Sequence, residues 1–276
     1  MSGGPGPQSL YWAEQSTAAL SARDPGRTIA VLPLGATEQH GPHLPLAVDT
    51  IQVEAVVRAL AAALPRESPV LFLPTLPVTL STEHLGFAGT LSLTPATFLA
   101  TLAEIAGQVA RNGVRKLVFL NGHGGNTAIL DVAARAARVE HGMLALRLNW
   151  FGVGLPEGLF PEGETARGIH GGAMETSLML HLAPELVDMS RARDFGNRAA
   201  TPDRMASGLG LAGPGTLAWA TEDLDPEGAC GDATAASAEA GERVLAHVVA
   251  GIAELLAKLD ALAPEDETGT PAWPVP

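Results

Sequence analysis

The stretch from Gly35 to Asp49 concentrates side chains that commonly bind metal ions. It follows an apolar run and contributes Glu38, His40, His43 and Asp49. Glu38 and His40 are two residues apart, so in extended backbone their side chains leave on the same side. Carboxylate and imidazole groups that converge on one point are the ligands that a divalent transition metal requires. We therefore predict a metal site in this stretch.

Two later segments carry groups of the same kind. The buried-strand run Arg115–Leu120 ends in Asn-Gly-His-Gly-Gly-Asn, which places His123 at the carboxyl end of a strand, where open α/β sheets bind their ligands. The other segment, His-Gly-Gly-Ala-Met-Glu, opens an apolar helix, with His170 in the preceding loop and Glu175 about one turn inside. We expect both segments to face the first stretch.

The three blocks together resemble the creatininase family of metal-dependent amidohydrolases. The resemblance runs from about Ile29 to about Ala240, in the family's order and spacing, and the late Gly-Ala-Cys-Gly-Asp block ending at Asp232 also looks like a family element. It implies a dinuclear centre with two divalent metal ions, and zinc, manganese or iron would fit the nitrogen and oxygen ligands. The implied ligands are Glu38, His40, Asp49, His123 and Glu175.

Residue chemistry suggests two further roles within such a centre. Asp49 suits a bridge between the ions, because a short carboxylate offers two oxygens and the start of a helix favours an anion. His170 lies close to the ligands in a loop and suits a general acid that protonates the leaving nitrogen, and the family resemblance implies the same role. The alternative for His170 is that it only orients Glu175.

Six other residues are predicted to line the pocket or to support ligands from outside. His43 and the pair Glu83-His84 could bind a metal, but we favour pocket wall or support for them. Gly124 and Gly125 are expected to let the backbone approach a metal or substrate closely. Arg167 would suit a substrate carboxylate or phosphate.

The chain departs from the creatininase pattern at two places. Creatininase carries a glutamate where this chain has Gly125, and it carries tryptophan on the loop before the catalytic histidine, where this chain has Thr165 to Gly168. A small flat ring would lose its stacking partner there. These changes leave the implied metal ligands intact but argue against creatinine as the substrate.

The composition limits the kind of protein further. The chain has 276 residues, 46% of them apolar, and a net charge of -13, with 30 acidic against 17 basic residues, so a nucleic acid partner is not expected. A single cysteine, Cys230, excludes an intramolecular disulfide and suits a reducing compartment. We see no signal peptide and no apolar run of membrane-spanning length, and we predict a cytoplasmic protein without a membrane partner.

Strand and helix patterns alternate along the chain. Strands are expected at Thr28–Leu34, Val70–Leu73, Leu76–Leu80, Arg115–Leu120 and Leu144–Leu148, and helices at Thr50–Leu64, Pro95–Arg111, Thr127–Glu140, Gly172–Leu182 and Ala233–Leu259. The Gly/Pro-rich segment Asn149–Ile169 shows no period and is a candidate active-site loop or lid, and Arg191–Pro226 resists assignment. Repeated βα units predict a three-layer α/β/α fold with a mainly parallel sheet. We place one such domain at residues 9–260, between disordered tails at 1–8 and 261–276.

We therefore predict a metal-dependent hydrolase that cleaves a non-peptide C–N bond in a small cyclic or linear amide, with a metal-activated water as nucleophile. A peptidase or formamide hydrolase of the same family is the alternative, and a non-catalytic metal- or metabolite-binding protein is a third possibility. The resemblance also implies a homo-oligomer, a hexamer by analogy.

Overall fold

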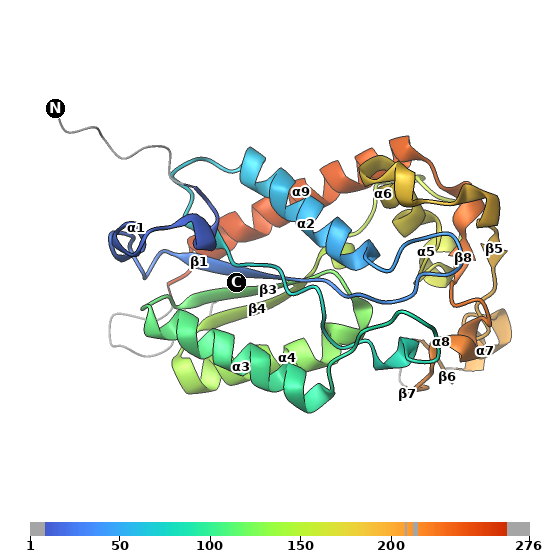
Figure 1. Ribbon diagram of the computed structural model, residues 1–276, viewed down its shortest axis with the longest axis horizontal. Coiled ribbons are helices and arrows are strands. Elements are labelled where there is room, and N and C mark those ends of the chain that lie inside the picture. The colour runs from blue at the N-terminus through green and yellow to red at the C-terminus, as the bar shows by residue number, and fades with distance from the viewer. Residues whose placement is uncertain (1–8, 208, 212–214, 264–276) are drawn as a thin grey trace.

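A four-stranded parallel sheet forms the centre of the computed structural model, which describes residues 9–207, 209–211 and 215–263 (Figure 1). The strand order is β2-β1-β3-β4, and every neighbouring pair is parallel. The strands are β1 (Ile29–Leu34), β2 (Val70–Phe72), β3 (Lys116–Asn121) and β4 (Leu144–Asn149).

Helices cover both faces of this sheet (Figure 1). One face packs against α2 (Val48–Ala63), α6 (Ala173–Leu182) and α9 (Ala238–Asp260). The opposite face packs against α3 (Pro95–Arg111) and α4 (Thr127–His141). The predicted three-layer α/β/α architecture is therefore confirmed.

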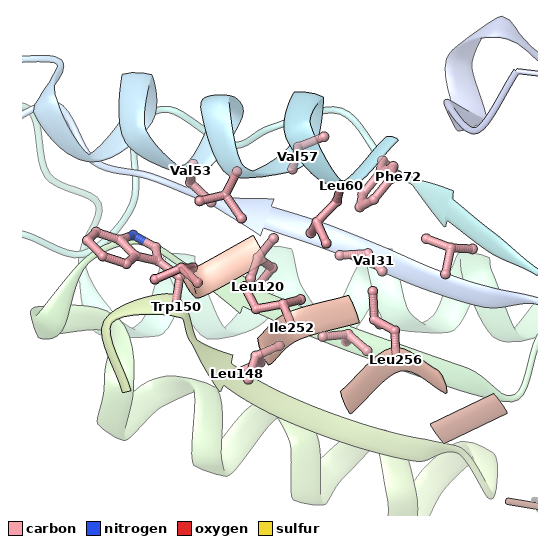
Figure 2. Close-up of a cluster of buried hydrophobic side chains, with 14 of the residues drawn as sticks. Val31, Val53, Val57, Leu60, Phe72, Leu120, Leu148, Trp150, Ile252 and Leu256 are labelled. Carbon is pink, nitrogen blue, oxygen red and sulfur yellow. The ribbon is translucent and has the colours of Figure 1, made fainter. Parts of the chain in front are cut away.

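The sheet is buried on both faces because its central strands are apolar at nearly every position. Along β1, Val31 belongs to the cluster under α2 and α9, whereas Leu32 belongs to the cluster under α3 and α4. Figure 2 shows the first cluster, to which α2 contributes Leu60 and α9 contributes Ile252. Fully burying one such side chain stabilises the fold by about 1.5–3 kcal/mol. These two clusters hold the strands, and thus the loops that follow them, in fixed positions.

Several helix ends follow from local sequence signals. The Thr94 hydroxyl accepts a hydrogen bond from the backbone N–H of Thr97, and Pro95 fills the first position of α3, as predicted. Ser237 caps α9 in the same way through the N–H of Ala240. A residue with positive φ, Gly142, ends α4.

One expected strand is wrong, and one expected helix starts later than predicted. Leu76–Leu80 is not a strand: only Leu76 pairs, with Leu34, because the following Pro77 has no N–H to extend the ladder. The long C-terminal helix begins at Ala238 rather than Ala233, after a separate 3-10 turn.

The segment Asn149–Ile169 is more ordered than its lack of period suggests. It contains a 3-10 turn at Trp150–Val153 and the short helix α5 (Glu164–Arg167). Trp150 is fully buried in the cluster of Figure 2. Helical turns this short leave no periodic signal in a sequence, which explains why the pattern did not reveal them.

The remaining elements are short, and several fall in the segment Arg191–Pro226 that the sequence left unassigned. They are α1 (Thr17–Ser21), α7 (Pro202–Ser207), α8 (Thr221–Leu224), β5 (Asp194–Phe195), β6 (Leu209–Gly210), β7 (Gly215–Thr216) and β8 (Gly231–Asp232). The boundaries of the single domain stay a prediction, and the two tails lie outside the described residues except for 261–263. Within the described ranges, no helix combines the length and apolar composition needed to cross a membrane.

Three strands end level with one another. Leu34 of β1 pairs in register with Asn121 of β3, which in turn pairs with Asn149 of β4. The loops that leave these strands therefore emerge at one edge of the sheet. In Figure 1 the segment after β1 runs from this edge towards α5 and β8 before it returns as α2.

Candidate metal centre

The segment after β1 carries Glu38 and His40 and ends in the first turn of α2, which holds Asp49. A close backbone approach makes this possible: a Cβ on Gly35 would lie 2.7 Å from the Cα of Thr50. Only glycine therefore lets the start of α2 pack directly against the end of β1. All three side chains are buried, Glu38 and His40 completely.

The structure brings the other two implied ligands to the same place. His123, at the end of β3, has its Nδ1 atom 3.1 Å from Oε1 of Glu38 and 3.4 Å from Oδ2 of Asp49. His40 Nε2 lies 3.4 Å from Oδ1 of Asp49 and 3.9 Å from Oε2 of Glu175, which projects from the first turn of α6. The five residues thus form one cluster of carboxylates and imidazoles.

Backbone carbonyls fix both imidazoles so that a lone pair points into the cluster. Nδ1–H of His40 donates to the carbonyl of Glu38, at 3.1 Å, which leaves Nε2 facing the carboxylates. Nε2–H of His123 donates to the carbonyl of Leu80, at 2.9 Å, which leaves Nδ1 facing them. Histidines that bind metals are commonly oriented by this kind of hydrogen bond.

Several inward atoms have no hydrogen-bond partner in the protein. They are both carboxylate oxygens of Glu38, Nε2 of His40 and Oδ2 of Asp49. Buried polar atoms are rarely left unpaired, so these call for a bound group. Glu38, Asp49 and His123 could hold one ion and His40, Asp49 and Glu175 another, with Asp49 common to both groups. The donor set is one of nitrogen and oxygen, which fits zinc, manganese or iron.

The electrostatics of the cluster also favour a cation. Burial lowers the pKa of His40, but neighbouring carboxylates, chiefly that of Asp49, outweigh this effect and raise the pKa to about 9. Burial also lowers the pKa of His123, but the neighbouring carboxylates outweigh this effect and raise the pKa well above its usual value. Burial, together with the charge of Asp49, raises the pKa of Glu175. Protons therefore supply the compensating positive charge that a metal ion would otherwise provide.

His170 lies beside this cluster, in the loop before α6. Its ring centroid is 4.1 Å from that of His40 and 4.3 Å from that of His84, so three imidazoles lie side by side. Nε2–H of His170 donates to the carbonyl of Gln39 at 2.7 Å, and Nδ1 lies 3.8 Å from Oε1 of Glu38. Burial, reinforced by the neighbouring histidines, holds its pKa well below the usual value. With Glu38 and His40 it could also share an ion.

Three other predicted residues lie close to the ligands. Nε2 of His43 is 2.9 Å from the hydroxyl of Thr176, and the ring stacks on Phe195, so His43 supports the start of α6. Glu83 and His84 lie on one 3-10 turn, Thr82–His84, and both line a cavity beside the cluster.

The structure assigns different roles to the two glycines and the arginine. A Cβ on Gly125 would lie 2.0 Å from Oε1 of Glu83, so glycine makes room for that carboxylate. A Cβ on Gly124, which lines the cavity, would meet no protein atom within 4 Å, and the close approach to a metal or substrate expected there stays a prediction. Arg167 does not line the cavity; its guanidinium contacts Glu164 at 3.3 Å and Asp194 at 2.8 Å. The structure thus does not support the predicted contact of Arg167 with substrate.

A cavity of about 360 Å³ opens onto the cluster. Its floor includes Asp49, His123, His170 and Glu175, and an apolar wall is formed by Phe151, Ile169, Met174 and Trp219. Sequence reasoning missed this wall because its members come from irregular segments and from one helix, with no shared spacing.

Sequence reasoning also missed two buried residues. Gln39 lies between two implied ligands, so its position in the first block was an available signal. The carboxylate of Glu164 accepts hydrogen bonds from the backbone N–H groups of Ala173 and Asp232, and joins α6 to β8. No local pattern indicates that role.

Comparison with known proteins gives consistent matches. A family model described as creatininase, creatinine amidohydrolase, matches residues 13–256. A mycofactocin precursor peptide peptidase of Mycobacterium tuberculosis is 37% identical over 225 residues, which cover 79% of this chain and 80% of the relative. The creatinine amidohydrolase of Pseudomonas putida is 32% identical over 90% of this chain and 94% of its own length.

Solved structures agree with these matches. A crystal structure of creatininase superposes with a TM-score of 0.75 at 31% identity, covering 93% of this chain and all of the other. A Zn–Zn form of a creatininase mutant and a manganese form of creatininase superpose with TM-scores of 0.73 and 0.74, each at 30% identity and over 92% of this chain.

Proposed function

Because this chain belongs to the creatininase family, whose members are hydrolases of C–N bonds, we propose that it cleaves an amide bond of a peptide with the aid of two divalent metal ions. The observation that carries the proposal is the set of buried, unpartnered atoms on Glu38, His40 and Asp49. With the oriented lone pair of His123 and the carboxylate of Glu175, these atoms complete two ligand groups that share Asp49. The zinc and manganese forms of creatininase are consistent with this donor set.

Ions bound there would polarise the amide carbonyl and lower the pKa of a water molecule. The protein would move the protons through His170. Its Nε2–H is committed to the carbonyl of Gln39, and its low pKa leaves Nδ1 unprotonated on the side that faces Glu38. Nδ1 would therefore take a proton from the attacking water and deliver it to the leaving nitrogen. The apolar wall of the cavity would limit the access of bulk water.

The cavity supports a peptide in preference to creatinine. At about 360 Å³ it is within the usual range for binding sites, and a small flat ring would leave much of it unfilled. Phe151 and Trp219 offer surface for an apolar side chain next to the scissile bond. The identity of 37% to a peptide peptidase supports the same choice. Creatinine stays the second candidate, because the creatinine amidohydrolase matches a larger share of the chain.

Metal content would test the proposed centre. We expect about two ions per chain by mass spectrometry in the wild type, and loss of at least one in Asp49→Asn, since Asp49 is common to both ligand groups. The exposed His247 offers a control, His247→Gln, which should keep both ions. A well-folded wild type that takes up neither zinc, manganese nor iron would remove the proposal.

Turnover would test the reaction and the substrate class. We expect hydrolysis of N-acylated peptides with an apolar or aromatic residue near the cleaved bond. His170→Gln should keep both ions, since neither of the two ligand groups that share Asp49 includes His170, but should lose most of kcat with the proton transfer. Faster turnover of creatinine than of every peptide would reject the peptide assignment.

A homo-oligomeric state and a cytoplasmic location stay predictions. Size-exclusion chromatography would test the first, and cell fractionation would test the second.

A further inference from the structure

A single turn contacts two of the implied ligands from outside. On the 3-10 turn Thr82–His84, Oε1 of Glu83 lies 3.4 Å from Nε2 of His123. The next residue, His84, contacts a different ligand: its Nε2 lies 3.3 Å from Oε1 of Glu38. The two side chains are 15% and 3% exposed, so both contacts are largely shielded from bulk water.

We propose that Glu83 and His84 are positioning residues, which hold His123 and Glu38 in the orientation that metal binding needs. The inference rests on the proposed function, because it takes His123 and Glu38 as ligands. It assigns one support to each ligand: the Glu83 carboxylate supports the His123 imidazole, and the His84 imidazole supports the Glu38 carboxylate.

The first contact lies on the side of His123 that points away from the cluster. Its Nε2–H donates to the carbonyl of Leu80 at 2.9 Å, and the Glu83 carboxylate lies next to the same N–H group. A negative charge at this position makes the opposite nitrogen, Nδ1, a more basic ligand and fixes the ring plane. Gly125 keeps the space open, since any Cβ there would collide with Oε1 of Glu83.

The second contact depends on the tautomer of His84, which Gln39 determines. Oε1 of Gln39 accepts a hydrogen bond from the N–H of Gly41 at 2.9 Å, and Nε2 donates to the carbonyl of Gly228 at 2.9 Å, so the amide orientation is fixed. The second hydrogen on Nε2 of Gln39 points to Nδ1 of His84, at 2.8 Å. Nδ1 of His84 is therefore the acceptor, and Nε2 carries the hydrogen. Its contact with Oε1 of Glu38 is electrostatic and not a hydrogen bond, since both Glu38 oxygens lack a hydrogen-bond partner.

This arrangement separates the pair from the ligands themselves. Because Nε2 of His84 carries a hydrogen, it has no lone pair to offer an ion. Among the described residues, none of the groups close enough to share an ion includes Glu83 or His84. The hydroxyl of Thr221 lies 3.0 Å from the carbonyl of Glu83 and 2.9 Å from Nδ1 of His84, so it can donate to either acceptor and anchors the turn.

Zinc affinity of the full-length protein, stripped of metal with a chelator, tests the inference. We expect Glu83→Gln and His84→Asn each to weaken zinc binding by about 10–100-fold in a competition titration with a chromophoric chelator. Circular dichroism should show both metal-free variants folded, so that a weaker affinity reports ligand orientation and not loss of the fold. The exposed residues Glu185 and His247 provide matched controls, Glu185→Gln and His247→Asn, which should bind zinc as the wild type does.

Nitrogen-15 NMR of the His84 ring adds a test that a merely structural role would not pass. We expect the tautomer with hydrogen on Nε2 in the wild type, and its loss in Gln39→Glu, which removes the amide donor. An Nδ1–H tautomer in the wild type would overturn the inference. So would unchanged zinc affinity in both turn variants with reduced kcat/KM, which would make the pair a substrate contact. If the wild type itself bound neither zinc, manganese nor iron, the proposed function would fail first.

Discussion

Metal binding should strengthen steeply as the pH rises from 7 to 9. The cause is the protonation of His40, whose pKa in the metal-free protein is raised to about 9 by neighbouring carboxylates, chiefly Asp49, against the opposing effect of burial. An ion that binds Nε2 of His40 must displace this proton. Protons and metal ions therefore compete for the same atom.

The magnitude follows from the pKa. At pH 7 the ring is two units below a pKa of about 9, and displacing its proton costs about 2.7 kcal/mol, or a factor of about 100 in affinity. The apparent Kd for zinc should thus fall by about tenfold per pH unit up to pH 9 and then level off. His123, whose pKa is also raised, would add a second proton and steepen the slope.

The metal-free protein should show the opposite trend in stability. A histidine whose pKa rises from 6.5 to about 9 on folding stabilises the fold fully below pH 6.5, and this contribution disappears as the pH passes through 9. For His40 the loss is about 3.4 kcal/mol. The melting temperatures of the loaded and stripped protein should therefore diverge between pH 6.5 and 9.

Chelator competition at several pH values would measure the affinity, and calorimetry in two buffers of different ionisation enthalpy would count the protons released. His247→Gln serves as the control, because this exposed ring lies on α9, away from the cluster. A Kd that does not change between pH 7 and 9, with no proton released, would refute the reasoning.

Three further predictions concern single side chains. Burial raises the pKa of Cys230 to about 12, so the native protein should resist labelling by iodoacetamide at pH 8 and react only when unfolded. Trp150→Ala should lower the free energy of unfolding by about 3–5 kcal/mol in urea titrations, because the ring is fully buried in the core of Figure 2. Arg167→Ala should leave KM for anionic and neutral peptides alike within twofold and lower the melting temperature, because the guanidinium contacts Glu164 and Asp194; a selective rise in KM for anionic peptides would restore the substrate role.

The fold was predictable where local signals coincide with burial. The continuous apolar run of β1 and the Thr94-Pro95 start of α3 need no knowledge of distant contacts, and both elements lie where the sequence places them. The strand expected at Leu76–Leu80 does not form, because Pro77 has no N–H group to continue the pairing that begins at Leu76.

The site was predictable in its residue types but not in its connections. Strand ends and glycine-rich loops marked the segments of His123 and Glu175, and the parallel sheet brings them together. The contact of His84 with Glu38 and the Trp219 wall join segments far apart in the sequence, and no periodicity encodes such contacts. Arg167 shows the opposite case: it is close to the site residues in the sequence, but its guanidinium contacts Asp194.

The five implied ligands come from the loop after β1, the start of α2, the end of β3 and the start of α6. Ions held among them would tie these segments together as a reversible cross-link without a covalent bond. Stabilisation of this kind grows with the concentration of free metal, because only the folded chain presents the complete set. Metal supply would then govern how long each molecule survives: a cell that runs short of the ion would expose these segments to proteases and lose the protein itself, and not only its activity.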